Sequence, residues 1–204
     1  MIDADTVRTA LRENAIDADE LLDTLYPDAF RRFRVQHTTP VEVSARAAAW
    51  LAPDGDARVL DVGSGAGRFC LAGALTTPGH FTGVEQRPWL VEAAREASLK
   101  LRVTTADFVC GDVRAVDWGA FDGFYLFNPF GENHLPDEER IDHDVELNAD
   151  RHDGDVAFVE AQLLRAPAGT RVAIWHRFSG MLEGYSCVRR ARVRGTVLEC
   201  LVRM

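Results

Sequence analysis

The chain has 204 residues, of which 47% are hydrophobic, and a net charge of −9 at pH 7. This size suits one domain with a sizeable core and leaves little room for a second. No stretch approaches the roughly 18 uninterrupted apolar residues of a membrane-spanning helix. The acidic first residues also lack the pattern of a secretory signal. We therefore expect a single domain over residues 1–204, located in the cytoplasm and not at a membrane.

The negative charge is concentrated in one segment. Residues 132–155 contain ten acidic side chains and two arginines, whereas the rest of the chain is nearly neutral. Proteins that bind nucleic acid usually present a basic surface, so this distribution argues against a nucleic-acid partner.

Residues 1–52 predict an N-terminal helical cap. Apolar residues recur at helical spacing within residues 1–35, which indicates two short helices. The run Thr39-Pro40-Val41-Glu42 then has the residues of a capping box, with Thr39 as the cap and Pro40 in the first helical position. We expect this next helix to continue to about Leu51.

Residues 56–204 alternate between short apolar runs and helical stretches, which is typical of a parallel sheet. The predicted strands are 58–62, 80–85, 106–110, 121–128 and 170–176, and the predicted helices are 66–76, 88–100, 143–165 and a short one near 113–118. Two further β-rich runs, 185–193 and 196–203, flank Arg194-Gly195 and indicate a closing antiparallel hairpin. The predicted fold is α/β and Rossmann-like, a mostly parallel seven-stranded sheet preceded by helices.

A glycine-rich turn follows the first predicted strand. Its candidate ligand-binding residues are Asp61, Gly63, Ser64, Gly65 and Gly67. Glycines permit a tight turn and let the backbone lie against a ligand, and the following helix presents free amide groups. A dinucleotide fingerprint would need a further glycine at position 68, where this chain has Arg68.

The second predicted strand ends in a carboxylate, Glu85, 22 residues after Gly63. An acid at this place can accept hydrogen bonds from both hydroxyls of a ribose. The third and fourth predicted strands lead into Gly111-Asp112-Val113 and Asn128-Pro129-Phe130. Because open α/β sheets bind ligands at the carboxyl ends of their strands, these segments belong to the same candidate site.

The glycine turn resembles motif I of class I S-adenosylmethionine-dependent methyltransferases, and the three later segments fit the same family. The resemblance implies S-adenosylmethionine as cofactor, with Glu85 on the ribose and Gln86 beside the adenine. It also implies that Asp112 binds the adenine amino group, with Val113 next to the ring. Over about residues 56–177 the core is loosely similar to the disruptor-of-telomeric-silencing type of histone-lysine methyltransferase.

The Asn128-Pro129-Phe130 segment resembles motif IV, which reads Asn-Pro-Pro-Tyr in many amino-group methyltransferases. The resemblance implies that the Asn128 side chain and the Pro129 carbonyl orient a target nitrogen, that Phe130 covers the acceptor, and that Asn128 also borders the cofactor. This chain has one proline, and Phe130 stands in place of tyrosine. That departure argues against base-specific methylation of nucleic acid.

We therefore expect methyl transfer to a nitrogen of a small-molecule or protein acceptor. Two alternatives stay open: an aminopropyltransferase-like enzyme of the same fold, and a non-catalytic protein that binds the cofactor or a partner. The sequence does not indicate an oligomeric state.

The acidic segment 132–155 is interpreted either as a mobile lid over the acceptor or as a solvated loop. A lid of this charge would favour a cationic acceptor. The spacings of His134, His143 and His152 match no helical pair of metal ligands, so we expect no metal. His134 is a weak candidate for a base, and His176 is expected to be structural.

Overall fold

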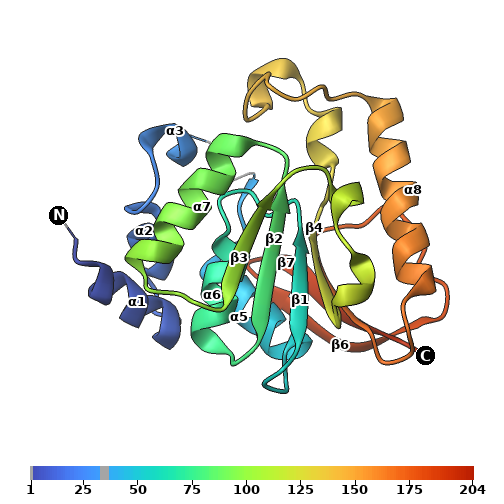
Figure 1. The fold of residues 1–204 in the computed structure, drawn as a ribbon, viewed down its shortest axis with the longest axis horizontal. Helices are drawn as coiled ribbons and strands as arrows, with labels where there is room; N and C mark the ends of the chain where they lie inside the picture. Colours follow the sequence, from blue (N-terminus) through green and yellow to red (C-terminus); the bar gives the residue numbers. More distant parts are fainter. Residues whose placement is uncertain (1, 33–36) are drawn as a thin grey trace.

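The computed structural model describes residues 2–32 and 37–204 (Figure 1). Its centre is a seven-stranded sheet with the strand order β3-β2-β1-β4-β5-β7-β6. The strands are β1 (Arg58–Val62), β2 (His80–Glu85), β3 (Ala106–Cys110), β4 (Gly123–Phe127), β5 (Arg171–Trp175), β6 (Tyr185–Val193) and β7 (Thr196–Arg203). Strands β1 to β5 pair in parallel, and β7 pairs antiparallel to both β5 and β6. The predicted Rossmann-like sheet with its closing hairpin is confirmed.

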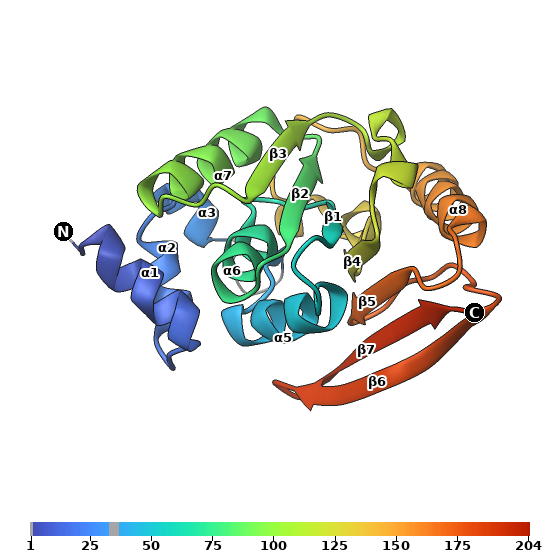
Figure 2. The same ribbon diagram turned by 60° about the horizontal axis from the view of Figure 1, so that its bottom comes forward.

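The α-helices are α1 (Ala4–Glu13), α2 (Ala18–Asp23), α3 (Asp28–Arg31), α5 (Val41–Leu51), α6 (Arg68–Thr76), α7 (Pro88–Lys100) and α8 (Ala149–Arg165). Four short 3₁₀ helices, η1 (Val113–Ala115), η2 (Trp118–Ala120), η3 (Gly131–His134) and η4 (Asp137–Glu139), lie between β3 and α8. Figure 2 shows α5, α6 and α7 on one face of the sheet and α8 on the other. The described residues 2–32 thus hold three short helices instead of the two expected within 1–35, and residues 33–36 lie outside the described part.

The central strands place apolar side chains on both faces of the sheet, so each face has its own hydrophobic core. Successive side chains of a strand point to opposite faces. Val59 of β1 and Tyr125 of β4 therefore join the core under α5 and α6. Their neighbours Leu60 and Phe124 join the core under α8. The ring of Tyr125 stacks on Phe69 of α6, with 3.9 Å between the ring centroids.

The N-terminal helices pack onto the first of these cores. Val7, Leu11 and Leu22 are fully buried in the same cluster as the sheet residues. Buried Arg68, at the start of α6, forms ion pairs with Asp19 and with Asp23 of α2. These contacts connect the N-terminal helices to the helix that follows the glycine turn.

The predicted cap of α5 is wrong in its details. Pro40, not Thr39, precedes the first helical residue, and the Thr39 hydroxyl instead forms a hydrogen bond of 3.1 Å with the Tyr125 hydroxyl. Asp19 Oδ1 accepts the hydrogen bond from the Val41 N–H at 2.9 Å. Thr39 is buried against β4, so its side chain satisfies the buried phenol and a distant carboxylate caps the helix.

Helix α8 begins at Ala149, six residues later than predicted. The Asn148 side chain caps it by accepting a hydrogen bond from the Arg151 N–H at 2.8 Å. Asparagine is a strong N-cap residue, so it fixes the start of the helix at Ala149.

Candidate functional site

A cavity of about 470 Å³ opens at the carboxyl ends of the parallel strands. This is the edge at which open α/β sheets bind ligands. Nine of the residues predicted for the site line it, namely Gly63, Gly65, Glu85, Gln86, Asp112, Val113, Asn128, Pro129 and Phe130. Segments that are far apart in the sequence thus meet at one cavity.

The glycine turn forms an open cradle in the wall of this cavity. The N–H groups of Gly63 and Ser64 both donate to the Val84 carbonyl, at 3.0 and 2.9 Å, which holds the turn against β2. Gly63 and Gly65 have φ values of 76° and 53°, a region that favours glycine. A Cβ atom on either residue would meet no atom within 4 Å. The backbone is therefore exposed to whatever the cavity holds.

Three predicted residues of this turn lie outside the cavity lining. A Cβ on Gly67 would come within 2.4 Å of the Phe108 ring, so this glycine lets α6 approach β3. Ser64 packs under Gly83 in the same way. Asp61 is buried and accepts a hydrogen bond from the Cys70 thiol at 3.7 Å. A direct role of these three in ligand binding stays a prediction.

The Glu85 carboxylate is fixed at the centre of the site. Its Oε2 accepts from the Gly65 N–H at 3.1 Å, and its Oε1 accepts from the Arg87 N–H at 2.9 Å. Burial raises the pKa of Glu85, although these hydrogen bonds and the Arg87 charge oppose the shift. Each carboxylate oxygen has two lone pairs, so both can accept a further hydrogen bond.

A network of charges lies at the end of β3. Asp112 Oδ1 caps η1 by accepting from the Arg114 N–H at 2.8 Å, and Asp112 Oδ2 lies 3.6 Å from Arg151 Nη2. Arg151 also donates to Gln86 Oε1 at 2.7 Å, and it forms an ion pair with Asp155. The predicted residues Gln86 and Asp112 are therefore held by an arginine of α8.

The end of β4 is a tight turn with unusual backbone angles. Asn128 and Phe130 have φ values of 39° and 67°, and the Gly131 N–H donates to the Asn128 carbonyl at 3.0 Å. A Cβ on Gly131 would come within 2.1 Å of Asn128 Nδ2, so any other residue there would displace the Asn128 side chain. Left-handed non-glycine residues cost free energy and cluster at functional sites.

The two candidate histidines are placed differently from expectation. His176, expected to be structural, lines the cavity with a φ of 70°. Burial lowers its pKa, which favours the neutral ring at pH 7. His134 is not among the residues that line the cavity, and its ring lies 4.1 Å from that of His152. The structure therefore brings His176 rather than His134 to the site.

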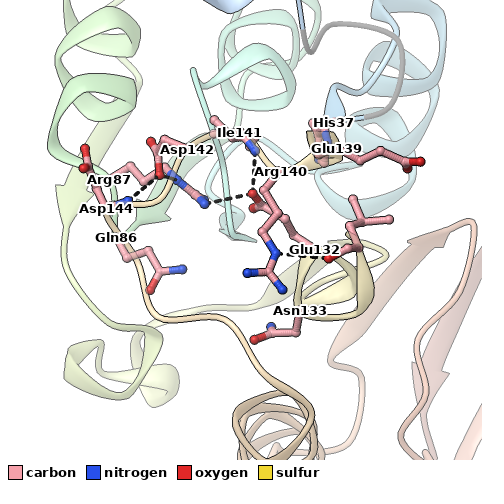
Figure 3. Close-up of polar contacts among 12 residues, drawn as sticks. His37, Gln86, Arg87, Glu132, Asn133, Glu139, Arg140, Ile141, Asp142 and Asp144 are labelled. Carbon is pink, nitrogen blue, oxygen red and sulfur yellow. Dashed lines mark hydrogen bonds and ion pairs between the residues drawn. The ribbon is translucent and has the colours of Figure 1, made fainter. Parts of the chain in front are cut away.

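Arg87 is a site residue that the sequence analysis missed. Its side chain is only 4% exposed. It donates to Glu132 Oε1 at 2.9 Å and to Asp142 Oδ1 at 2.8 Å, as Figure 3 shows. Buried charges persist in proteins when they are paired in this way. Both partners come from the acidic segment, 45 and 55 residues away, so no local pattern could indicate the contact.

Neither a metal centre nor a membrane-spanning helix is found in the part of the chain that the structure describes. Within residues 2–32 and 37–204, no group of three or more His, Cys, Asp or Glu side chains is placed to hold a metal ion. Among the helices in those same ranges, none has both the length and the apolar character needed to cross a bilayer.

Comparison with known proteins places the fold. Residues 53–146 match a family model described as a methyltransferase domain. No curated protein matches the sequence. An RNA methyltransferase from Salinibacter ruber, solved in complex with S-adenosyl-L-homocysteine, is 19% identical with a TM-score of 0.59, covering 81% of this chain and 93% of its own.

Two further solved structures share this architecture. Magnesium protoporphyrin IX methyltransferase from Synechocystis PCC 6803, with bound SAM, is 18% identical with a TM-score of 0.56 and covers 100% of this chain and 98% of its own. The [4+2]-cyclase SpnF is 17% identical with a TM-score of 0.52, and the match covers 78% of this chain and 62% of the cyclase chain. The chain therefore has the Rossmann-like methyltransferase fold, and identities this low carry the fold alone.

Proposed function

We propose that this chain is an S-adenosylmethionine-dependent methyltransferase whose cofactor occupies the cavity at the carboxyl edge of the sheet. The methyltransferase-domain match over residues 53–146 and the methyltransferase fold support an enzyme of this class. Two solved structures of the same fold contain S-adenosylmethionine or its product. The observation that carries the proposal is the open cradle of Gly63 and Gly65 beside the fixed carboxylate of Glu85.

The cavity walls fit the adenosyl half of this cofactor. The free lone pairs of Glu85 accept the two ribose hydroxyls, and Gln86 lies beside the base. Asp112 accepts the adenine amino group while Val113 contacts the ring. Gly63 and Gly65 allow the rest of the cofactor to lie against the backbone, since no side chain fills that space.

The acceptor side then needs to orient one nucleophile. The cofactor supplies a methyl group already activated by its sulfonium charge. The Asn128 side-chain oxygen and the Pro129 carbonyl accept N–H groups of the acceptor, which directs the nitrogen lone pair at the methyl carbon. Such alignment contributes roughly 7–11 kcal/mol in ideal intramolecular reactions. Neutral His176, which lines the same cavity as His37, is a side chain able to take up the proton that the nitrogen loses.

Charge in the cavity favours an amine as acceptor. Its lining contains four carboxylates against two arginines, namely Glu85, Asp112, Glu132 and Asp155 with Arg87 and Arg151. A wall with excess negative charge attracts cations and disfavours anions. A small amine or a lysine side chain of a protein fits this wall, and the lysine would agree with the resemblance to histone-lysine methyltransferases.

Calorimetry with S-adenosylmethionine and S-adenosylhomocysteine tests the cofactor. We expect the wild type to bind both and Glu85→Gln to lose about 10- to 100-fold in affinity, because a charged hydrogen bond contributes about 1.5–3 kcal/mol. Glu92→Gln, an exposed position on α7, serves as the matched control and should leave the affinity unchanged. No binding by the wild type would refute the proposal.

Labelled cofactor separates the remaining alternatives. We expect label from the methyl group to enter an amine-bearing acceptor when the protein is incubated with a lysate. Label in neither protein nor small molecules, despite tight cofactor binding, would favour the non-catalytic alternative. Transfer of label from the aminopropyl group of decarboxylated cofactor, with none from the methyl group, would favour an aminopropyltransferase.

A further inference from the structure

The geometry points to Arg87 as a positioning residue that couples the cofactor carboxylate Glu85 to the wall of the acceptor site. That wall is formed by residues 131–144, which we name the cover segment. The inference rests on the proposed function and deepens it, because it assigns a role to the acidic segment.

Arg87 joins Glu85 through both its backbone and its side chain. Its N–H donates to Glu85 Oε1 at 2.9 Å, and its Nη1 lies 4.0 Å from the same oxygen. The guanidinium is thus close enough to interact with the carboxylate but beyond hydrogen-bonding distance of it.

Two carboxylates of the cover segment hold the guanidinium in that place. Glu132 Oε1 accepts from Arg87 and also from the Ile141 N–H at 2.7 Å, which ties the two ends of the cover segment together. Asp142 accepts from Arg87 through Oδ1 and from the Trp89 indole through Oδ2 at 2.7 Å. Figure 3 shows Arg87 between Glu132 and Asp142. The cover segment is therefore fastened to the start of α7.

The fastened segment forms part of the cavity. Glu132, Asn133, Leu135 and Ile141 line it, whereas Asp142 does not. Two further residues of the cover segment, Asn133 and Glu139, form hydrogen bonds to residues outside it. His37 Nε2 and the Glu139 carbonyl are 3.1 Å apart, and the Asn148 N–H donates to Asn133 Oδ1 at 3.0 Å.

A consequence follows for Glu85. Arg87 has three carboxylates around one buried charge, two of them on the cover segment. If one of those two loses its charge, the guanidinium keeps only one partner on the cover segment, and its attraction to Glu85, 4.0 Å away, is no longer opposed by the second, so it turns toward Glu85. Arg87 then occupies the lone pairs that the ribose hydroxyls need. The cover segment thus keeps Glu85 available to the cofactor, and a formed donor site requires a formed acceptor wall.

The test uses Asp142→Asn, which neutralises a carboxylate outside the cavity lining. We expect S-adenosylhomocysteine to bind about fivefold or more weakly, the lower range of typical coupling between sites. Hydrogen exchange of the backbone in residues 131–141 should also increase. Asp137→Asn is the control, since Asp137 pairs with Arg140 in the same segment at 2.8 Å but is exposed. Asp137→Asn should change neither the affinity for S-adenosylhomocysteine nor the hydrogen exchange of residues 131–141.

The outcomes separate this inference from the proposed function. Unchanged affinity in a folded Asp142→Asn variant, with wild-type binding intact, would overturn the coupling and leave the methyltransferase proposal in place. Absence of wild-type binding would defeat both. If Asp142→Asn does not fold, Trp89→Phe removes the indole donor to the same carboxylate, keeps an aromatic ring in place, and should weaken binding in the same direction. Equal affinity of Trp89→Phe and wild type would then count against the coupling.

Discussion

The two sides of the cavity are built in different ways. On the donor side, the ligand-facing groups follow directly from the ends of β1, β2 and β3, and short backbone contacts hold them, such as Gly65 N–H to Glu85. On the acceptor side, the cover segment is joined to the rest of the protein by contacts such as Arg87 to Glu132 and His37 to Glu139, between residues 45 and 102 positions apart. The glycine cradle and Glu85 therefore follow from local sequence, whereas the acceptor wall depends on tertiary structure. Gln86 and Asp112 share that dependence, because Arg151 of α8 holds them. Substitutions on the donor side should weaken cofactor binding, whereas substitutions on the acceptor side should slow methyl transfer.

The largest effect is expected on the donor side, from Gly65→Arg. A non-glycine residue is strained at φ 53°, and its side chain would fill the cradle that faces the cavity. We expect S-adenosylhomocysteine binding to fall more than about 100-fold in calorimetry, beyond the loss from a single hydrogen bond. Gly195→Arg is the matched control, because Gly195 has φ 83° and open space but lies in the turn of the β6–β7 hairpin. Equal losses in both variants would indicate general strain instead.

A change on the acceptor side should spare cofactor binding. Asn128→Ala removes the amide proposed to orient the acceptor nitrogen, so transfer of labelled methyl should slow about 10- to 100-fold, as for the loss of a positioning hydrogen bond. Affinity for S-adenosylhomocysteine should change little in calorimetry. A parallel loss of cofactor affinity would show that the two sides cannot be separated at Asn128.

Acidity offers a further way to probe the donor side. Burial raises the pKa of Glu85 above its ordinary value of 4.5. The ribose hydroxyls need the charged carboxylate as an acceptor, so affinity should be constant above this pKa and fall below it, by up to about tenfold per pH unit. Calorimetry across pH 4 to 8 measures this. The Glu85→Gln variant should lack the dependence, and a surviving dependence would assign it to another group.

The smallest effect concerns Asp61 and the stability of the fold. Burial raises the pKa of Asp61 from its ordinary value of 3.8 to about 8. The folded state thus binds a proton more tightly than the unfolded state. This contribution to stability is complete below the unfolded pKa and is lost as pH rises through the folded pKa.

Asp61→Asn should remove that dependence. Between pH 5 and 8 the free energy of unfolding of the wild type should fall relative to that of the variant, by up to about 1.4 kcal/mol per pH unit. Urea unfolding at several pH values provides the measurement. Parallel pH profiles for the two proteins would mean that Asp61 is charged in the folded state.

The sequence predicted most of what local patterns control. The strands, the glycine turn and Glu85 were accessible because short apolar runs between helical stretches and three spaced glycines carry their own structural meaning. The start of α8 was missed because the cap by Asn148 was not considered. The cap of α5 was missed because its carboxylate, Asp19, lies 22 residues away.

On the acceptor side, prediction stopped at Asn128-Pro129-Phe130. The acidic segment was expected to be either a mobile lid or a solvated loop, and charge counting could not show that Glu132 and Asp142 pair with a buried arginine. Arg87 itself stands in an ordinary helix start before Pro88. His176 gave no pattern that distinguishes a cavity residue from a structural one.

The ion pairs of Arg68 make the glycine turn dependent on a part of the protein that never touches the ligand. Its guanidinium is enclosed by Asp19 and Asp23, while its own backbone opens the helix that carries the cradle. No residue within the described range 2–32 lines the cavity. Deletion of residues 1–30 would nevertheless remove both carboxylates and the helices that pack against α6 behind the donor loop, so we expect it to lower the affinity for the cofactor.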